Sequence, residues 1–357
     1  MSSSPQVTIF DGHNDTLLAL YRPKPGAERS FFERSAHGHI DLPRAEAGGF
    51  GGGFFAVFVP PPLSNEPERE PMPSTSGPYE APLPAPLELG YAQRTALGMA
   101  ATLFRLEADS AGRLRVVRSA AELAQCLADG VLAAILHFEG AEMIDPELEV
   151  LEVFYQAGLR SLGPVWSRPN AFGHGVPFAY PRTPDTGPGL TEAGKGLVAA
   201  CNRLKIMLDL SHLNEQGFWD VARLSSAPLV ATHSNAHALC ASTRNLTDRQ
   251  LDAIRDSDGV VGLNFAVSFL REDGAYDADT PLEVMLRHLD YLVARVGIDR
   301  VGLGSDFDGA KVPQAIGDVS GLPVLVAALR QHGYDAPSLR KLAHENWLRV
   351  LRLTWGG

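Results

Sequence analysis

The chain has 357 residues, of which 45% are hydrophobic and 20% charged, a composition typical of a folded protein with a sizeable core. Its formal net charge of -11 argues against a nucleic-acid backbone as partner, because such a partner favours a basic surface. The three cysteines, Cys126, Cys201 and Cys240, are few and odd in number. They argue against a disulfide framework and favour a reducing compartment.

The start of the chain, "MSSSPQVTIF", shows neither the basic region nor the apolar region of a secretory signal. No apolar run is long enough to cross a bilayer. We therefore expect a cytoplasmic protein with no membrane attachment.

Apolar segments alternate with amphipathic segments along almost the whole chain. The pattern predicts strands at 7–10, 53–59, 131–137, 161–165, 206–210, 229–232, 260–264 and 301–304. It predicts helices at 87–105, 146–157, 191–204, 215–224, 247–255 and 282–296, the fifth of them with a capping box at its start.

Strands that are apolar throughout and separated by helices indicate a parallel sheet covered on both faces. Such an order fits a doubly wound sheet or a (β/α)8 barrel, and about eight repeats favour the barrel. We predict one α/β domain, a (β/α)8 TIM barrel over residues 1–357. A Pro-rich stretch at about 60–87 is expected to be a surface insertion after the second strand, and residues 336–353 are expected to form closing helices.

Polar side chains follow five of the predicted strands. The first strand leads into "DGHND", where Gly12 would let the chain turn and where His13 and Asp15 would point to the same side. Glu139 ends "AAILHFE", His212 follows "KIMLDLS", His233 follows "APLVAT", and Asp306 follows "RVGLGS". The carboxyl ends of the strands of a TIM barrel converge on one face, where active sites lie.

Each of these residues also has a purely structural interpretation. His212 could lie beside a helix N-cap, His233 could be a core histidine, and Asp306 could cap a helix. Their joint occurrence at strand ends favours a metal site, because buried carboxylates and imidazoles need a partner. His13, Asp15, Glu139, His212 and His233 are too many ligands for one tetrahedral zinc ion.

The five ligands suit two metal ions with a carboxylate, Glu139, as the bridge. Such a pair acidifies a shared water molecule, and Asp306 could then act as general base and general acid. The reaction class would be hydrolysis at a carbonyl or phosphoryl centre. Zinc fits this donor set, and manganese or iron could also occupy it.

The motifs "DGHND", "HFEGAE", "LDLSH", "ATHSNAHAL", "STRNLTD" and "GLGSDFDG", in this order, resemble the membrane dipeptidase (renal dipeptidase) family of the amidohydrolase superfamily. The resemblance runs from Phe10 to about Gly309. It implies a (β/α)8 barrel with two Zn2+ ions, one bound by His13 and Asp15, the other by His212 and His233, and both by Glu139.

The same resemblance implies that Asp306 shuttles protons and that Arg244 holds the C-terminal carboxylate of the substrate. It implies hydrolysis of dipeptides, including L-aminoacyl-D-amino acids such as L-Ala-D-Ala, and suggests a homodimer. The sequence departs from the family at Trp166, where a histidine that polarises the scissile carbonyl is expected. His174 could reach the same space from a longer loop, or could be an ordinary loop histidine.

Two other functions stay open at this point. The chain could be a different metal-dependent amidohydrolase that acts on a cyclic amide or an ester, including a phosphoester. It could also be a binding protein that has kept the barrel and lost the chemistry. Dependence on a free substrate carboxylate, through Arg244, would separate the dipeptidase from the first, and an empty metal site would favour the second.

Overall fold

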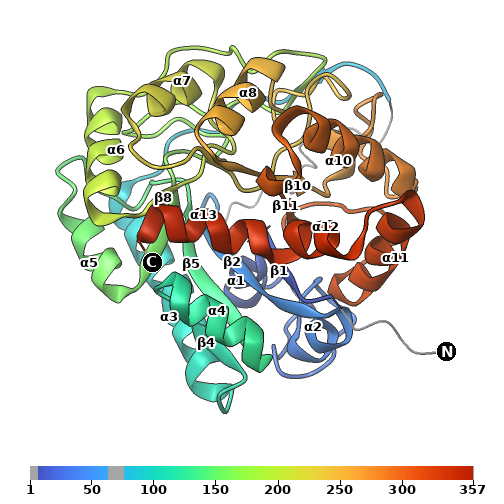
Figure 1. Cartoon of the computed structure of the whole chain (residues 1–357). Helices are drawn as coiled ribbons and strands as arrows, with labels where there is room; N and C mark the ends of the chain where they lie inside the picture. Colours follow the sequence, from blue (N-terminus) through green and yellow to red (C-terminus); the bar gives the residue numbers. More distant parts are fainter. Residues whose placement is uncertain (1–6, 63–75, 357) are drawn as a thin grey trace.

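The computed structural model describes residues 7–62 and 76–356, and eight parallel strands form its centre, with helices packed around them (Figure 1). The strands are β1 (Ile9–Asn14), β2 (Phe50–Phe58), β5 (Leu132–Glu139), β6 (Leu159–Gly163), β8 (Met207–Leu208), β9 (Val230–Ala231), β10 (Val260–Asn264) and β11 (Val301–Gly304). Their spatial order is β8-β6-β5-β2-β1-β11-β10-β9. A single parallel bridge between Asp209 and Val230 joins the two ends of this order. The result is a nearly closed barrel, which confirms the predicted fold class.

Each of the eight predicted strand segments overlaps a strand of the barrel, and β10 and β11 have the predicted bounds. The prediction that the first strand turns at Gly12 is wrong, because β1 continues to Asn14. Gly12 is required for a different reason, the close packing of a neighbouring segment. A Cβ atom at this position would lie 2.4 Å from the carbonyl oxygen of Thr232, so the glycine allows the end of β9 to come close.

The helices lie outside the barrel; most of them stand between its strands in the chain, and the last three follow the final strand, β11. They are α1 (Thr16–Tyr21), α2 (Leu42–Gly48), α3 (Leu89–Asp109), α4 (Ala120–Asp129), α5 (Glu149–Ala157), α6 (Glu192–Leu204), α7 (Glu215–Leu224), α8 (Asp248–Asp256), α9 (Val267–Leu270), α10 (Leu282–Val296), α11 (Leu322–His332), α12 (Ala336–Arg340) and α13 (Asn346–Trp355). The six predicted helices correspond to α3, α5, α6, α7, α8 and α10. The predicted capping box is present at α8, where the amide of Thr247 donates to Oε1 of Gln250 over 2.8 Å.

The predicted insertion follows β2. Its residues 63–75 lie outside the described residues, and Tyr79–Glu80 form β3, which pairs with β7 (Ala179–Tyr180) as an antiparallel ribbon. One further strand, β4 (Leu114–Val116), pairs with the first half of β5. None of the helices in the described ranges is both long and apolar enough to cross a bilayer.

The C-terminal helix covers one end of the barrel (Figure 1). Trp347 of α13 is fully buried, and its Nε1 donates to the carbonyl of Leu303 over 3.2 Å. Its indole lies 5.4 Å from the ring of Phe54, which in turn lies 6.1 Å from the ring of His137. The interior of the barrel therefore changes from aromatic near α13 to polar toward the carboxyl ends of the strands.

Candidate metal centre

The polar residues predicted to converge do lie at one end of the barrel. His13 is the next-to-last residue of β1, and Glu139 is the last residue of β5. His212, His233 and Asp306 follow β8, β9 and β11 within a few residues. Because all eight strands are parallel, these positions share the carboxyl face of the barrel.

One carboxylate oxygen, Oε1 of Glu139, is the centre of the cluster. It lies 3.0 Å from Nε2 of His212, 3.5 Å from Nε2 of His13 and 3.5 Å from Nε2 of His233. Oδ2 of Asp15 lies 3.4 Å from Nε2 of His13 on the other side. All five side chains are buried. The described residues form three groups able to hold a metal ion: Glu139–His212–His233, His13–Asp15–Glu139 and His13–Asp209–His233.

The donor set fits divalent cations. Both ring nitrogens of His13 are buried, and neither has a hydrogen-bond partner among the described residues. Nε2 of His212 and Nε2 of His233 are only 3.1 Å apart, with their ring planes tilted toward each other. Three imidazole nitrogens and two carboxylates that face one small volume are the ligands expected for zinc, and Glu139 belongs to two of the three groups.

The electrostatics of the cluster point the same way. Burial lowers the pKa of His212 and the pKa of His233 well below the ordinary value, so both rings are neutral. Burial raises the pKa of Glu139. Burial also acts to lower the pKa of His13, but Glu139, Asp15 and Asp306 outweigh it and raise that pKa to about 10. The carboxylates thus hold a positive charge at the position where a cation would fit.

Asp306 is held in place by the backbone turn in which it lies and by the side-chain amide of Asn264. Its backbone is left-handed, with φ of 59°, and its amide donates to the carbonyl of His13 over 3.0 Å. Nδ2 of Asn264, the last residue of β10, donates to Oδ2 of Asp306 over 3.0 Å. The adjacent Ser305 is fixed by the buried carboxylate of Asp11, which accepts from its amide and its hydroxyl over 2.6 and 2.8 Å.

Arg244 lies beside the cluster, and its side chain is buried. One terminal nitrogen donates to the carbonyl of His233 over 3.2 Å, and the guanidinium stacks over the ring of Phe269 at 5.4 Å. Its Nε has no hydrogen-bond partner among the described residues. Burial lowers the pKa of Arg244, whereas Asp306 and Glu139 act to raise it. An arginine remains protonated under these conditions, so the site offers a buried cation with a free donor.

The structure places His174 and Trp166 differently from one another. Nδ1 of His174 lies 3.4 Å from the carbonyl oxygen of Gly189, so its ring bonds to a loop rather than to the five ligand residues. The ring of Trp166 lies 5.8 Å from the ring of His212 and 4.8 Å from that of Phe58. Trp166 therefore forms a wall of the site, while the role of His174 stays a prediction.

Sequence reasoning did not assign a role to several residues that support the cluster. Ser167 contacts Nδ1 of His212 over 2.9 Å, and Thr232 contacts Nδ1 of His233 over 2.8 Å. Asp209 accepts a hydrogen bond from that threonine. The signal was partly visible, because Asp209 and Thr232 stand within three residues of the histidine that follows their strand.

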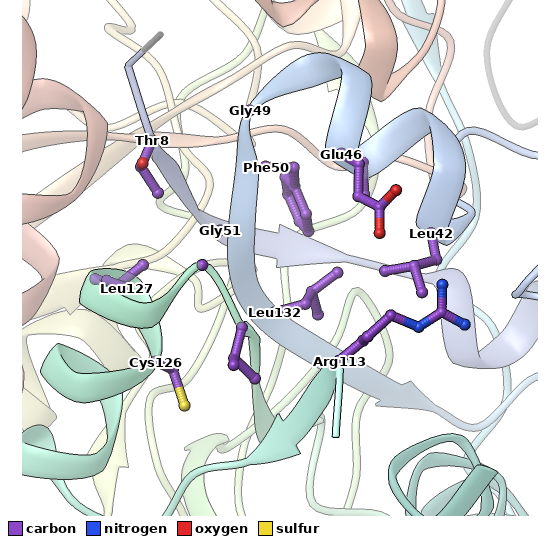
Figure 2. A pocket seen from close by; sticks show the side chains of 13 residues that line it. Thr8, Leu42, Glu46, Gly49, Phe50, Gly51, Arg113, Cys126, Leu127 and Leu132 are labelled. Carbon is purple, nitrogen blue, oxygen red and sulfur yellow. The ribbon is translucent and has the colours of Figure 1, made fainter. Parts of the chain in front are cut away.

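A cavity of about 270 Å³ lies elsewhere in the molecule (Figure 2). Thr8, Phe50 and Leu132 line it and stand at or before the starts of β1, β2 and β5, so it is at the opposite end of the barrel from the cluster. Glu46 and Arg113 also line it, as do Cys126 and Leu127 of α4. This cavity is separate from the metal centre.

Comparison with known proteins agrees with the geometry of the cluster. The sequence model of the membrane dipeptidases, peptidase family M19, matches residues 4–354. A metallopeptidase from Rhodobacter sphaeroides, solved with a phosphinate mimic of the dipeptide L-Ala-D-Ala, is 58% identical; the match covers 98% of this chain and 100% of the other, with a TM-score of 0.95. An uncharacterized protein from the pqqA 5′ region of Klebsiella pneumoniae is 56% identical over 71% of this chain and 94% of its own length.

A more distant relative, the dipeptidase tcpJ of Claviceps purpurea, is 27% identical over 96% of this chain and 76% of its own length. The family match spans almost the entire sequence, and it agrees with the donor set found at the carboxyl face of the barrel. This chain belongs to the membrane dipeptidase family, peptidase family M19, and is a metallodipeptidase.

Proposed function

We propose that this metallodipeptidase uses two zinc ions bridged by Glu139 to hydrolyse dipeptides, including L-aminoacyl-D-amino acids such as L-Ala-D-Ala. The observation that carries the proposal is the approach of three imidazole nitrogens to one oxygen of Glu139, all within 3.5 Å. A carboxylate in this position can serve two ions, since it belongs to two of the three potential ligand groups.

In this proposal His13 and Asp15 hold one ion, and His212 and His233 hold the other. Bound zinc would supply Lewis acidity and lower the pKa of a water molecule at the site. The remaining parts of the reaction fall to Arg244 and Asp306.

Arg244 binds the substrate. Its free Nε and its buried guanidinium suit the C-terminal carboxylate of a dipeptide, because charge-assisted hydrogen bonds are strongest away from water. The stacking on Phe269 and the bond to the carbonyl of His233 fix the plane of the guanidinium. A substrate that lacks the carboxylate would leave this cation unpaired.

Asp306 moves the proton. As general base its carboxylate takes a proton from the attacking water, and as general acid it gives that proton to the leaving amine. Asn264 binds Oδ2 of Asp306 and leaves Oδ1 without a hydrogen bond in the part of the chain that the structure describes. The left-handed turn holds the backbone of Asp306 against His13. In this proposal His174 assists at the scissile carbonyl, in place of the family histidine that is absent at Trp166.

The choice of substrate is supported by the Rhodobacter sphaeroides relative, whose bound ligand mimics L-Ala-D-Ala. The proposed partner is a small dipeptide, with no role for nucleic acid or a membrane surface. A homodimer and a cytoplasmic location stay predictions.

The test is hydrolysis of a dipeptide panel by the zinc-loaded protein, with L-Ala paired to L- and D-residues and free amine detected by ninhydrin. Each dipeptide is measured beside its C-terminally amidated counterpart. We expect cleavage of L-Ala-D-Ala that is lost on amidation. Failure to cleave any dipeptide, with two zinc ions bound per chain, would contradict the proposed substrate and favour a cyclic amide or an ester.

A further inference from the structure

The barrel is weakest between β8 and β9, and one buried carboxylate joins these strands. Each strand has two residues, and the backbone link is the Asp209–Val230 bridge with a hydrogen bond from the amide of Leu210 to the carbonyl of Val230. Oδ1 of Asp209 accepts from the amides of Ser211 and Thr232 over 3.0 and 2.9 Å. Asp209 thus ties the residue before His212 to the residue before His233.

The other oxygen of this carboxylate, Oδ2, determines which atoms donate in a chain of hydrogen bonds that leads to His233. Oδ2 of Asp209 lies 2.5 Å from Oγ1 of Thr232, which lies 2.8 Å from Nδ1 of His233. A carboxylate has no hydrogen to give, so the threonine hydroxyl donates its single hydrogen to Asp209. The contact between Thr232 and His233 must then be donated by the imidazole. The proton of neutral His233 is therefore on Nδ1, and the lone pair of Nε2 faces Glu139.

His212 lacks this arrangement. Its Nδ1 contacts the hydroxyl of Ser167 over 2.9 Å, and across residues 7–62 and 76–356 that hydroxyl has no other hydrogen bond. Ser167 can donate or accept in this contact, so it does not select a tautomer of His212. The hydrogen bonds around His233 therefore select its tautomer, whereas those around His212 do not.

We propose that Asp209 is a positioning residue of the metal centre: through Thr232 it fixes the tautomer of His233, and through its second oxygen it sets the spacing of His212 and His233. The proposal rests on the assignment of these two histidines as metal ligands. Outer carboxylates that orient metal-binding imidazoles contribute about 10–100-fold to metal affinity.

The variant Asp209→Asn tests this. The two backbone amides keep the amide oxygen of the new side chain at the position of Oδ1, so its NH2 group faces Thr232. The threonine hydroxyl would then donate to Nδ1 of His233, and the ring proton would move to Nε2, the ligand nitrogen. We expect 15N-histidine NMR of the metal-free proteins to show an Nδ1–H tautomer at His233 in the parent and an Nε2–H tautomer in the variant.

Zinc binding gives a second measurement. We expect the parent to bind two zinc ions and Asp209→Asn to hold one of them about 10–100-fold more weakly. Thr232→Ser, which keeps the hydroxyl, should behave as the parent. Adding Thr232→Val to Asp209→Asn should restore part of the lost affinity, because the misdirected donor is removed. A role for Asp209 in folding alone would not produce that recovery.

The outcomes are separable. An unchanged His233 tautomer with unchanged binding of both ions in Asp209→Asn would overturn the inference. If the parent itself binds fewer than two zinc ions, the proposed binuclear site fails, and the tautomer of the metal-free parent still tests the proton chain. If Asp209→Asn does not fold, Thr232→Val takes its place. In that protein the His233 Nδ1–H signal should lose its protection from solvent exchange. A protected signal would count against the hydrogen-bond chain from His233 through Thr232 to Asp209.

Discussion

At the scale of single residues, two neighbouring aspartates of the site, Asp306 and Asp308, differ in their hydrogen-bond partners. Asp306 and Asp308 stand two positions apart, both in left-handed backbone with φ of 59° and 66°. Asp306 faces Asn264 and the cluster, whereas Asp308 accepts from the hydroxyl of Thr16 and the amide of His39. The first therefore stands where a proton can be moved, and the second holds two segments of chain together.

The pair of aspartates offers a direct test of the proton shuttle. Replacing Asp306 by Asn keeps shape and hydrogen bonding to Asn264 but removes the basic group, so we expect kcat to fall by about 10²–10⁴-fold with zinc content unchanged. Asp308→Asn is the matched control and should lose far less activity. Steady-state kinetics with metal analysis of both variants checks this, and near-normal turnover of zinc-loaded Asp306→Asn would contradict the assignment.

His288 links a single residue to the pH dependence of stability. It is buried, with Nδ1 accepting from the amide of Ala236 and Nε2 donating to the carbonyl of Leu270. Burial lowers its pKa to about 4. Between this value and about 6.5 the unfolded chain binds the proton and the folded chain does not, so folding loses up to about 3 kcal/mol as pH falls through that window.

The variant His288→Gln keeps one donor and one acceptor but cannot titrate. Its free energy of unfolding should therefore fall less than that of the parent between pH 7 and pH 4.5, measured by urea denaturation at both values. His37→Gln, at an exposed position, serves as the control. Equal acid sensitivity of parent and His288→Gln would show that this histidine is not a source of it.

At the scale of elements, predicted and observed helices agree most closely where local signals are strong. The helix α6 begins after Thr191, whose hydroxyl accepts from the amide of Gly194, as its sequence indicates. The short β8 and β9 show the opposite case, since the apolar segments around them predicted strands about twice as long. Their ends leave the ladder because Asp209, Ser211 and Thr232 exchange side-chain hydrogen bonds in place of backbone pairing.

Two glycines of α6 should respond in opposite ways to alanine. A Cβ at Gly194 would lie 1.9 Å from the carbonyl oxygen of Phe172, whereas one at Gly196 meets nothing within 4 Å. We expect Gly194→Ala to lower the free energy of unfolding by about 1–3 kcal/mol. Gly196→Ala should raise it by about 0.5–1 kcal/mol, because alanine loses less backbone entropy in a helix. Urea denaturation of both variants measures this, and a similar effect at the two positions would refute the steric argument.

At the scale of the whole molecule, the two ends of the barrel have different tasks. The end near α13 is closed by Trp347, which fits between strands at three glycines; Cβ atoms at Gly12, Gly262 and Gly302 would lie 2.6, 3.0 and 2.6 Å from its indole. The other end holds the cluster of candidate metal ligands. The last helix of the chain therefore completes the core on which the ligand geometry depends.

This arrangement predicts a large cost for removing the indole. Trp347→Ala should lower the free energy of unfolding by about 3–5 kcal/mol, because it leaves a cavity inside the barrel. Leu353→Ala, on an exposed position of the same helix, should change it by less than about 1 kcal/mol. Chemical denaturation of the two variants decides the matter, and equal effects would mean that α13 does not seal the barrel.

The sequence by itself determined the alternation of strands and helices, the barrel, and the strand ends at which the chemistry lies. These features depend on local composition and on the rule that parallel strands end on one face, so they can be derived without coordinates. Arg244 came from family resemblance alone, since an arginine in a loop has no local signature of its buried place beside His233.

Only the tertiary structure decided how the ligands are oriented and what surrounds them. The meeting of His13 with Glu139, the chain from Asp209 through Thr232 to His233, and the contact of Trp166 with His212 each join segments far apart in sequence or depend on side-chain direction. Gly12 shows the same limit, because its role is set by Thr232, which follows β9 and lies more than 200 residues away, rather than by its own turn. Close approach between distant segments is a property of packing, and local sequence does not encode it.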